Sequence, residues 1–226
     1  MVSMRGSLAP IRPDSIAARQ EGIGKQLLEA KPELDLYGPD GLRLVVFRWA
    51  ENAGRQGVMA LLDGNRLALH ADLSWKEGIG DWAAPGKPRE SLQVTNIHVM
   101  PGYEGRRLAV RSYLRLAAAG QRMVSDFEQT PAGRRIWDDI RAMAPRLGLE
   151  VNAWHVARRE AGPADELIRD VYAAGSLYLL AMEPLAPELR AGFRLPTAEE
   201  FRADEVEDDV PVWELEDDVD DRDREP

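Results

Sequence analysis

The stretch LQVTNIHVMPGYEGRRLAVRSYLRLAAAG, residues 92–120, decides the fold that this sequence predicts. β-Favouring residues at 92–99 are followed by a turn at 101–105 that contains proline and glycine. Residues 106–119 then carry apolar side chains at helical spacing, and Gly120 closes the segment. The pattern predicts a strand that leads through a tight turn directly into a helix. Because the first turn of a helix has unpaired backbone N–H groups and partial positive charge, this junction can bind a phosphorylated ligand.

The residues before this unit predict antiparallel strands. Short segments rich in Val and Leu are separated by turn residues, and Asp63-Gly64-Asn65 is typical of a two-stranded hairpin. We expect these strands at residues 34–37, 42–49, 58–62 and 66–75.

The residues after the unit alternate between strand and helix patterns. Strands are expected at 122–125, 149–156 and 176–182, and helices from Pro131, capped by Thr130, to before Pro145 and at 163–174. Sequential strands joined by one helix pair in parallel with a right-handed crossover, so the strands at 92–99, 122–125 and 149–156 are expected to be parallel neighbours. The predicted fold class is α/β, with a mixed central sheet and helices on both faces.

Three parts are expected along the chain. Residues 1–33 predict a helical extension, with Asp14 or Ser15 as its N-cap. Residues 34–196 form the predicted α/β domain. Residues 197–226 predict a short helix, opened by a Thr-x-x-Glu capping box, and a disordered acidic tail.

The charge of the chain is concentrated in that tail. The 226 residues carry a formal net charge of −10, whereas residues 204–226 alone hold 13 acidic and 2 basic residues. The rest of the chain is therefore close to neutral, with 27 basic and 26 acidic residues. A neutral body argues against nucleic-acid binding, which depends on neutralising phosphates. No apolar run of about 18 residues predicts a membrane span, and no cysteine is present, so a cytoplasmic location is expected.

Two motifs resemble the GCN5-related N-acetyltransferase (GNAT) superfamily, in a divergent form like that of phages and mobile elements. The first is VMPGYEGRRLA at 99–109, and the second is SDFEQTPAGRRIW at 125–137, where Thr130, Gly133 and Trp137 fall on the family spacing. The resemblance implies the acyl-CoA N-acyltransferase fold, acetyl-CoA as cofactor and acetyl transfer to a small-molecule or protein amine. It also implies that acetyl-CoA lies between the strand at 97–99 and the strand at 123–125.

The same resemblance assigns the site residues. The implied cofactor-binding residues are Ile97, Val99, Glu104, Gly105, Arg106, Arg107, Leu108, Ala109, Ser125 and Thr130. His98 and Asp126 are the candidate catalytic groups, because each can take a proton from the amine. The alternatives are that His98 is a surface or packed histidine and that Asp126 serves a loop or cap. No metal site is expected, since the three histidines lack a ligand spacing.

Three positions depart from the family pattern and keep other functions open. Glu104 stands where the family has Gln or Arg, Arg107 replaces the central glycine, and Trp137 replaces a tyrosine that often acts as an acid. A second hypothesis is therefore an inactive GNAT-fold protein with a binding or structural role, whose acidic tail engages a protein partner. Within the tail, residues 210–215 form an apolar island that can anchor such a contact. A third hypothesis is an inhibitor whose tail imitates nucleic acid.

Overall fold

The computed structural model describes residues 31–49, 54–77, 90–126, 129–155, 160–163, 178–190 and 193–194. Contacts group the chain into two units, Met1–Leu195 and Pro196–Pro226, and all described residues belong to the first. Residues 1–30 of the expected helical extension, the helix expected at 197–202 and residues 164–174 of the helix expected from Pro163 lie outside the described residues. The predicted division into three parts therefore stays a prediction.

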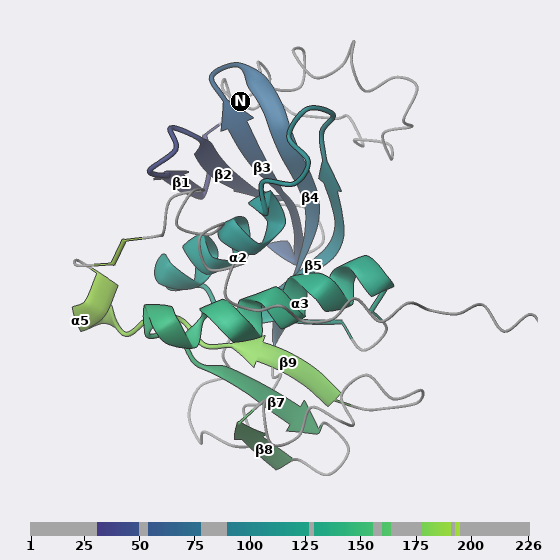
Figure 1. The fold of residues 1–226 in the computed structure, drawn as a ribbon, viewed down its shortest axis with the longest axis vertical. Coiled ribbons are helices and arrows are strands. Elements are labelled where there is room, and N and C mark those ends of the chain that lie inside the picture. The colour runs from purple at the N-terminus through teal and green to yellow at the C-terminus, as the bar shows by residue number, and fades with distance from the viewer. Residues whose placement is uncertain are drawn as a thin grey trace, which may run out of the picture. The chain divides into compact units, whose positions relative to one another are not determined.

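The described part of the chain forms one mixed sheet in the order β1-β2-β3-β4-β5-β6-β9-β7-β8 (Figure 1). Its strands are β1 (Leu34–Tyr37), β2 (Arg43–Arg48), β3 (Gln56–Asp63), β4 (Arg66–Glu77), β5 (Glu90–Val99), β6 (Met123–Val124), β7 (Val151–His155), β8 (Glu160–Pro163) and β9 (Tyr178–Met182). The helices are α2 (Leu108–Ala118), α3 (Pro131–Met143), the 3₁₀ turn η4 (Pro145–Leu147) and α5 (Pro187–Arg190).

The first half of the sheet is an antiparallel meander whose interior is covered on both faces. β1 to β5 pair with their sequence neighbours, and the tight turn after Asp63 joins β3 to β4 as expected. Residues 57–62 of β3 are all buried although successive side chains point to opposite faces. One of these faces holds a cluster made of Val45, Phe47, Val58, Ala60, Leu62, Leu67 and Met100.

The second half of the sheet confirms one parallel pairing and corrects another. β5 and β6 are joined through α2 and pair in parallel, as the sequence predicts. β7 is not the parallel neighbour of β6, because β9 lies between them and is antiparallel to both. A strand near the end of the chain therefore completes the sheet, which the local rule of one helix between parallel neighbours does not anticipate.

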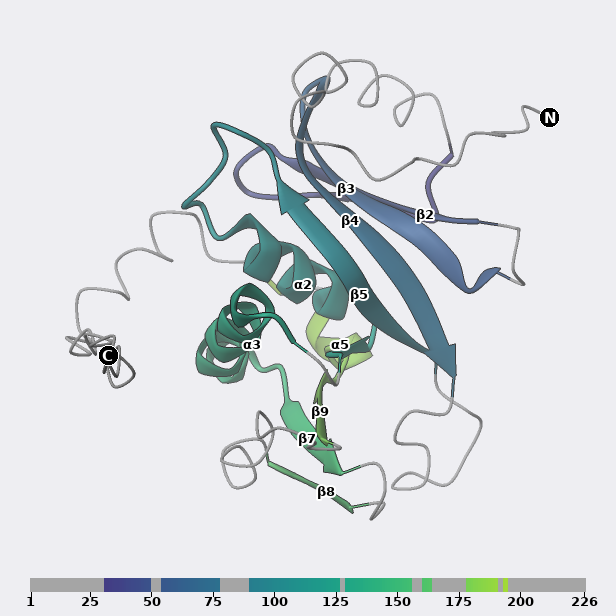
Figure 2. The same ribbon diagram turned by 90° about the vertical axis from the view of Figure 1, so that its right-hand side faces the viewer.

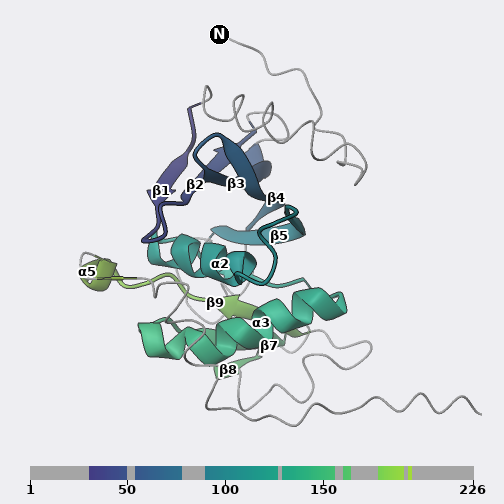
Figure 3. The ribbon, with the colours of Figure 1, turned by 45° about the horizontal axis from the view of Figure 1, so that its top comes forward.

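The mixed α/β sheet is confirmed, and it is consistent with the acyl-CoA N-acyltransferase fold that the resemblance implies. Figures 2 and 3 show α2 and α3 beside each other on one side of the β3–β5 strands. Three details differ from the prediction: α2 begins at Leu108, Pro163 ends strand β8, and α5 was not expected. Among the described residues, no helix is long and apolar enough to cross a membrane.

Helix α2 is buried around its whole circumference, including two arginines. Arg111 forms an ion pair with Asp40 at 2.9 Å, and Arg115 donates hydrogen bonds to the carbonyl oxygens of Leu36 and Leu42. Burial lowers the pKa of Arg115 to about 10, while Asp40 favours its charged form. These contacts pair the two cations with acceptors and attach α2 to the β1–β2 turn, and an unpaired buried charge would be strongly destabilising.

Strands β5 and β6 pair over two residues and then separate. Leu92 pairs with Met123 and Gln93 with Val124, and β5 continues for six residues beyond this point. The Gln93 side chain donates a buried hydrogen bond of 3.2 Å to the Ser125 carbonyl oxygen. This bond therefore fixes the junction at which the two strands part.

Nearby, Arg122 precedes β6 and contacts residues of β5 and β7 and the residue that follows β9. Its guanidinium donates to Ser91 and to Glu183 at 2.9 Å each, and it lies over the Trp154 ring at 5.0 Å. Removing any of these partners would leave a buried polar group without its contact.

Replacing Gln93 with methionine tests the role of the junction. The variant keeps the side-chain volume but leaves the buried Ser125 carbonyl without its donor, so the free energy of unfolding falls by about 2 kcal/mol. Urea unfolding measures the change. The control is the same substitution at half-buried Gln121, which is expected to cost less than about 0.5 kcal/mol. Equal losses of unfolding free energy at both positions would show that the hydrogen bond from Gln93 to Ser125 does not stabilise the junction.

Candidate functional site

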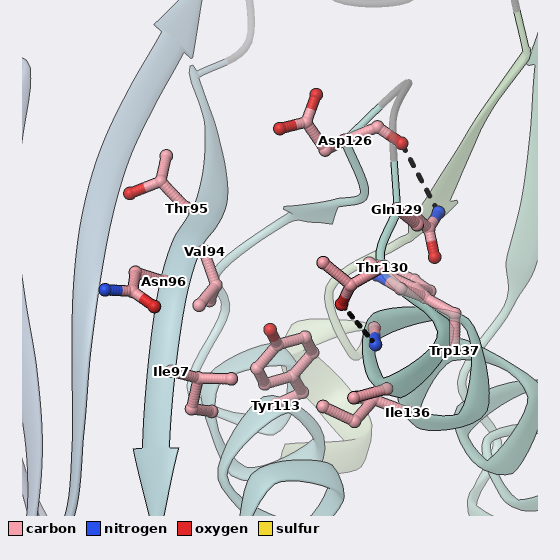
Figure 4. A pocket seen from close by; sticks show the side chains of 12 residues that line it. Val94, Thr95, Asn96, Ile97, Tyr113, Asp126, Gln129, Thr130, Ile136 and Trp137 are labelled. Atoms are coloured by element: carbon pink, nitrogen blue, oxygen red, sulfur yellow. Dashed lines mark hydrogen bonds between the residues drawn. The ribbon is translucent and has the colours of Figure 1, made fainter. Parts of the chain in front are cut away.

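A cavity of about 200 Å³ lies where β5 and β6 part. β5 contributes residues 94–97, α2 contributes Tyr113, and the segment from Asp126 through the first two turns of α3 contributes the opposite wall. Figure 4 shows these side chains converging between the strand and the two helices. The cavity therefore lies between the two strands where the family resemblance implies a bound ligand.

The β5 wall is an exposed strand edge with a bulge. Thr95 is an extra residue in the pairing with β4, and its hydroxyl donates a 3.3 Å hydrogen bond to the Asp72 carbonyl oxygen. In the described part of the chain, no strand pairs with the β6-facing edge of residues 94–99. Such an edge offers backbone donors and acceptors to an extended ligand.

The opposite wall is the N-terminus of α3. The Thr130 hydroxyl accepts a 3.1 Å hydrogen bond from the Gly133 N–H, and Pro131 occupies the first helical position. The prediction that Thr130 caps this helix is confirmed. Asp126 stands at the upper rim of the cavity in Figure 4, where its backbone carbonyl accepts a hydrogen bond from the Gln129 side chain.

Tyr113 and Trp137 form the aromatic part of the lining. Their rings meet edge to face, with centroids 6.0 Å apart and planes at 69°. Both side chains are buried, and burial raises the pKa of the Tyr113 phenol. The phenol therefore keeps its proton over the physiological range and can act as a hydrogen-bond donor.

The turn between β5 and α2 is held by its own side chains. The Glu104 carboxylate folds back and accepts a 2.6 Å hydrogen bond from the Gly102 N–H. The Tyr103 hydroxyl donates to Asp63 at 2.9 Å, and the Arg106 guanidinium lies over the Tyr103 ring at 5.1 Å. Next to these contacts, a side chain added at Gly105 would meet no atom within 4 Å, so the turn faces open space there.

Arg107 adopts the backbone conformation that a glycine favours. It precedes α2 with φ 50° and ψ 33°, the only non-glycine positive φ among the described residues. Its side chain reaches α3, where its Nε lies 3.9 Å from the Asp139 carboxylate and its Nη1 lies 3.9 Å from the Met143 sulfur. The turn is thus left-handed although Arg107 is not a glycine, and the guanidinium contacts the neighbouring helix α3.

The structure brings some of the sequence-predicted residues together and not others. Ile97, Asp126 and Thr130 line the cavity. Val99, 37% exposed, lies farther along β5, and residues 104–109 form the turn and start of α2 outside the cavity. The Ser125 hydroxyl is bonded within the protein, where it accepts from the Leu180 N–H at 2.9 Å and donates to the Asp126 carbonyl at 3.1 Å.

His98 lies on the other face of the sheet from the cavity. Alternation along β5 separates its side chain from that of Ile97, and His98 pairs across the strands with His70. His70 is 6% exposed and its Nε2 has no hydrogen-bond partner among the described residues. Burial lowers the pKa of His70, with Asp72 acting to raise it and His98 to lower it. His98 itself is exposed.

Several lining residues were not predicted from the sequence as site residues. These are Val94, Thr95, Asn96, Tyr113, Gln129, Ala132 and Ile136. Of these residues, Tyr113 is the one that the sequence could have indicated, because it places a hydroxyl-bearing aromatic side chain in a largely apolar helix. Ten residues of that helix are buried in the structure. The others are ordinary strand and helix residues whose role appears only when β5 and α3 face each other.

The residues present fit the extended arm of an acyl-CoA more clearly than its phosphates. An open strand edge and an apolar, aromatic lining suit a pantetheine chain and an acyl thioester. At the α2 N-terminus no acidic residue lies in the first turn and no side chain caps the helix, which suits an anion. Glu104 is the opposing charge in that turn, and the Gly102 N–H is already bonded to it.

Two variants of Arg107 separate its backbone strain from its side-chain contacts. Arg107→Gly and Arg107→Ala both remove the contacts to α3, but only alanine keeps a Cβ in the left-handed conformation. The glycine variant is therefore expected to be the more stable of the two by about 1 kcal/mol. Chemical denaturation of both proteins measures the difference, and an alanine variant at least as stable as the glycine variant would exclude the strain.

The buried His70 predicts a loss of stability in acid. Its folded-state pKa is below the ordinary 6.5, so the unfolded chain binds more protons and the free energy of unfolding falls as pH drops below that value. In His70→Leu this part of the pH dependence disappears. Unfolding of both proteins between about pH 7.5 and 5 measures the difference, because titration common to both cancels. A difference that does not change with pH would refute the assignment to His70.

No protein-family model and no curated protein matches the chain. Among solved structures, the chain is similar to the Bacillus subtilis N-acetyltransferase YlbP in complex with coenzyme A. The identity is 15%, the match covers 56% of this chain and 67% of that chain, and the TM-score is 0.30. At these values the likeness carries no argument about what this chain binds or does.

Proposed function

We propose that this protein binds an acyl-CoA, with acetyl-CoA as the expected form, and transfers its acyl group to an amine. The observation that carries the proposal is the early parting of β5 and β6, which pair at two positions and then enclose a cavity. The same β5 strand leads through a glycine-containing turn into α2. One unit thus offers an edge for an extended chain and a helix N-terminus for an anion.

The chain's own residues would bind and orient the ligand. A bound acyl-CoA supplies an acyl group activated as a thioester. Backbone groups along residues 94–97 would hold the arm beside the strand, and Ile97, Ile136 and Trp137 would keep water from the reacting end. At the other end, Gly105 leaves space beside the α2 N-terminus, and the exposed Arg106 adds positive charge.

Two groups are candidates for taking the proton of the attacking amine. Asp126 stands at the rim of the cavity, so an amine entering there would meet a carboxylate. His98 lies on the other face of β5, so it would act only on an amine that approaches from that side. The identity of the amine stays open, and a cytoplasmic location remains part of the proposal.

The alternative function is a GNAT-like protein that binds a partner without catalysis. The specific observation in its favour is Arg107, whose side chain is directed to Asp139 and Met143 of α3. Glu104 adds a negative charge to the same turn. In this alternative, the acidic tail engages a protein partner.

Calorimetric titration with acetyl-CoA tests the proposal. We expect a dissociation constant between about 1 µM and 1 mM, the usual range for enzyme substrates. Absence of binding at millimolar ligand would reject it and leave the non-catalytic alternative.

A pair of substitutions at Gly105 locates the phosphates. Gly105 has φ 69° and open space around it, and asparagine and aspartate tolerate this conformation best among residues with a Cβ. Gly105→Asp adds a negative charge at the α2 N-terminus and is expected to weaken acetyl-CoA binding about tenfold more than the matched Gly105→Asn. Equal affinities of the two variants would place the phosphates elsewhere.

A further inference from the structure

We propose that residues 14–30, which lie outside the described part of the chain, pack as an amphipathic helix across the outer face of β2, β3 and β4. The outer face is the side of the sheet that carries one buried apolar cluster. Its members are Val45, Phe47, Val58, Ala60, Leu62, Leu67 and Met100. The inference concerns the packing of the domain and does not depend on the proposed acyl transfer.

The outer face is the side of the sheet opposite to α2 and α3. Residues paired across neighbouring strands share a face, and successive residues alternate between faces. Ile97 lines the cavity together with Tyr113 of α2 and pairs with Ala71, so Ala71 lies on the helix side. Ala60 pairs with His70, the residue before Ala71, so both lie on the outer face. Figures 2 and 3 show α2 and α3 on one side of these strands, and neither helix covers the other side.

The outer face is nevertheless buried. The side chains of its cluster are 0 to 7% exposed, and His70 beside them is 6% exposed. An antiparallel sheet that turns one face to water carries polar side chains there, whereas the centre of this face is apolar. α5 is not the cover, because the Leu185 N–H just before it bonds to the Ala117 carbonyl oxygen near the end of α2. The cover therefore comes from residues outside the described ranges.

The buried area has the width of one helix. Neighbouring strands lie about 4.8 Å apart, so the axes of β2 and β4 are about 10 Å from each other. A helix with its side chains is about 10–12 Å across. On β5 the same face is open, since Asn96 and His98 are both exposed. One helix along β2–β4 thus accounts for the cover and leaves His98 accessible to solvent.

The sequence of residues 14–30 suits this face. Ile16, Ile23 and Leu27 are seven and four residues apart, so they lie on one side of a helix, and Lys25 lies on the opposite side. Residues 204–226 suit it less, because 13 of them are acidic and would place carboxylates against apolar side chains.

The connection to the sheet is short enough for this packing. The Glu33 N–H donates a 2.8 Å hydrogen bond to the Val46 carbonyl oxygen, so the chain joins the sheet beside β2 within three residues of Ala30. A helix of residues 14–30 would be about 25 Å long. The buried stretch 58–62 of β3 is about 15 Å long, so the helix can span it completely.

Single introduced thiols test the proposal in the full chain, which has no cysteine of its own. Ala60→Cys and Ala71→Cys place one thiol on each face of the sheet, at two fully buried alanines. Both are expected to react slowly with a thiol reagent. Adding Leu27→Gln weakens the packing of the helix and is expected to speed the reaction of Ala60→Cys at least about tenfold, with no change for Ala71→Cys. Lys25→Gln is the matched control and is expected to change either rate less than about twofold.

Three results of the thiol experiment would overturn the proposal. Rapid reaction of Ala60→Cys without a second substitution would show that the outer face is open. A rate that Leu27→Gln leaves unchanged would show that another segment covers it. Equal acceleration of Ala60→Cys and Ala71→Cys would show that Leu27 does not act on the outer face in particular.

A second measurement locates the helix without weakening its packing. A nitroxide label on Lys25→Cys, on the side away from the sheet, broadens the NMR signals of nearby amides. We expect stronger broadening in β2, β3 and β4 than in α2 and α3, and the reverse order or no broadening would overturn the proposal. Broadening in unlabelled, isotope-enriched chains mixed with labelled ones would assign the outer face to a second copy and also overturn it.

Discussion

Two residue pairs hold the parallel strands β5 and β6 together, and the candidate site depends on where this pairing stops. Gln93 bonds to the Ser125 carbonyl at the last pair, and Arg122 ties Ser91, Glu183 and Trp154 together beside it. These contacts stabilise the junction at which the two strands separate. β5 continues with one edge unpaired within the described chain, and the cavity occupies the space that a longer β6 would fill.

The turn into α2 combines a backbone conformation that is typical of glycine with charged side chains. Arg107 occupies a left-handed position that a glycine would take more easily, and its guanidinium is placed against α3. Glu104 completes the turn through the Gly102 N–H. The backbone is therefore suited to an anion at the start of α2, while the local charges are mixed. Binding experiments at this turn measure which of the two effects is larger.

The sequence predicted local features well and long-range ones poorly. The strand, turn and helix at 92–120 were predicted closely because turn chemistry and periodicity are encoded within a few residues. The insertion of β9 between β6 and β7 was missed, since strand order depends on partners distant in the sequence. Ile97 and Asp126 were placed at the cavity through motif resemblance, whereas Tyr113 was not identified. Its place in the cavity lining depends on the rotation of α2 and the approach of α3, which no local pattern specifies.

The proposed function requires that the open edge of β5 receives an acyl-CoA. Hydrogen–deuterium exchange of the backbone amides, with and without saturating CoA, tests it most directly. We expect slower exchange along residues 94–99 and at the starts of α2 and α3, with no change in the β7–β8 pair at the far edge of the sheet. Exchange along 94–99 that stays the same while CoA is bound, or protection confined to other strands, would contradict it.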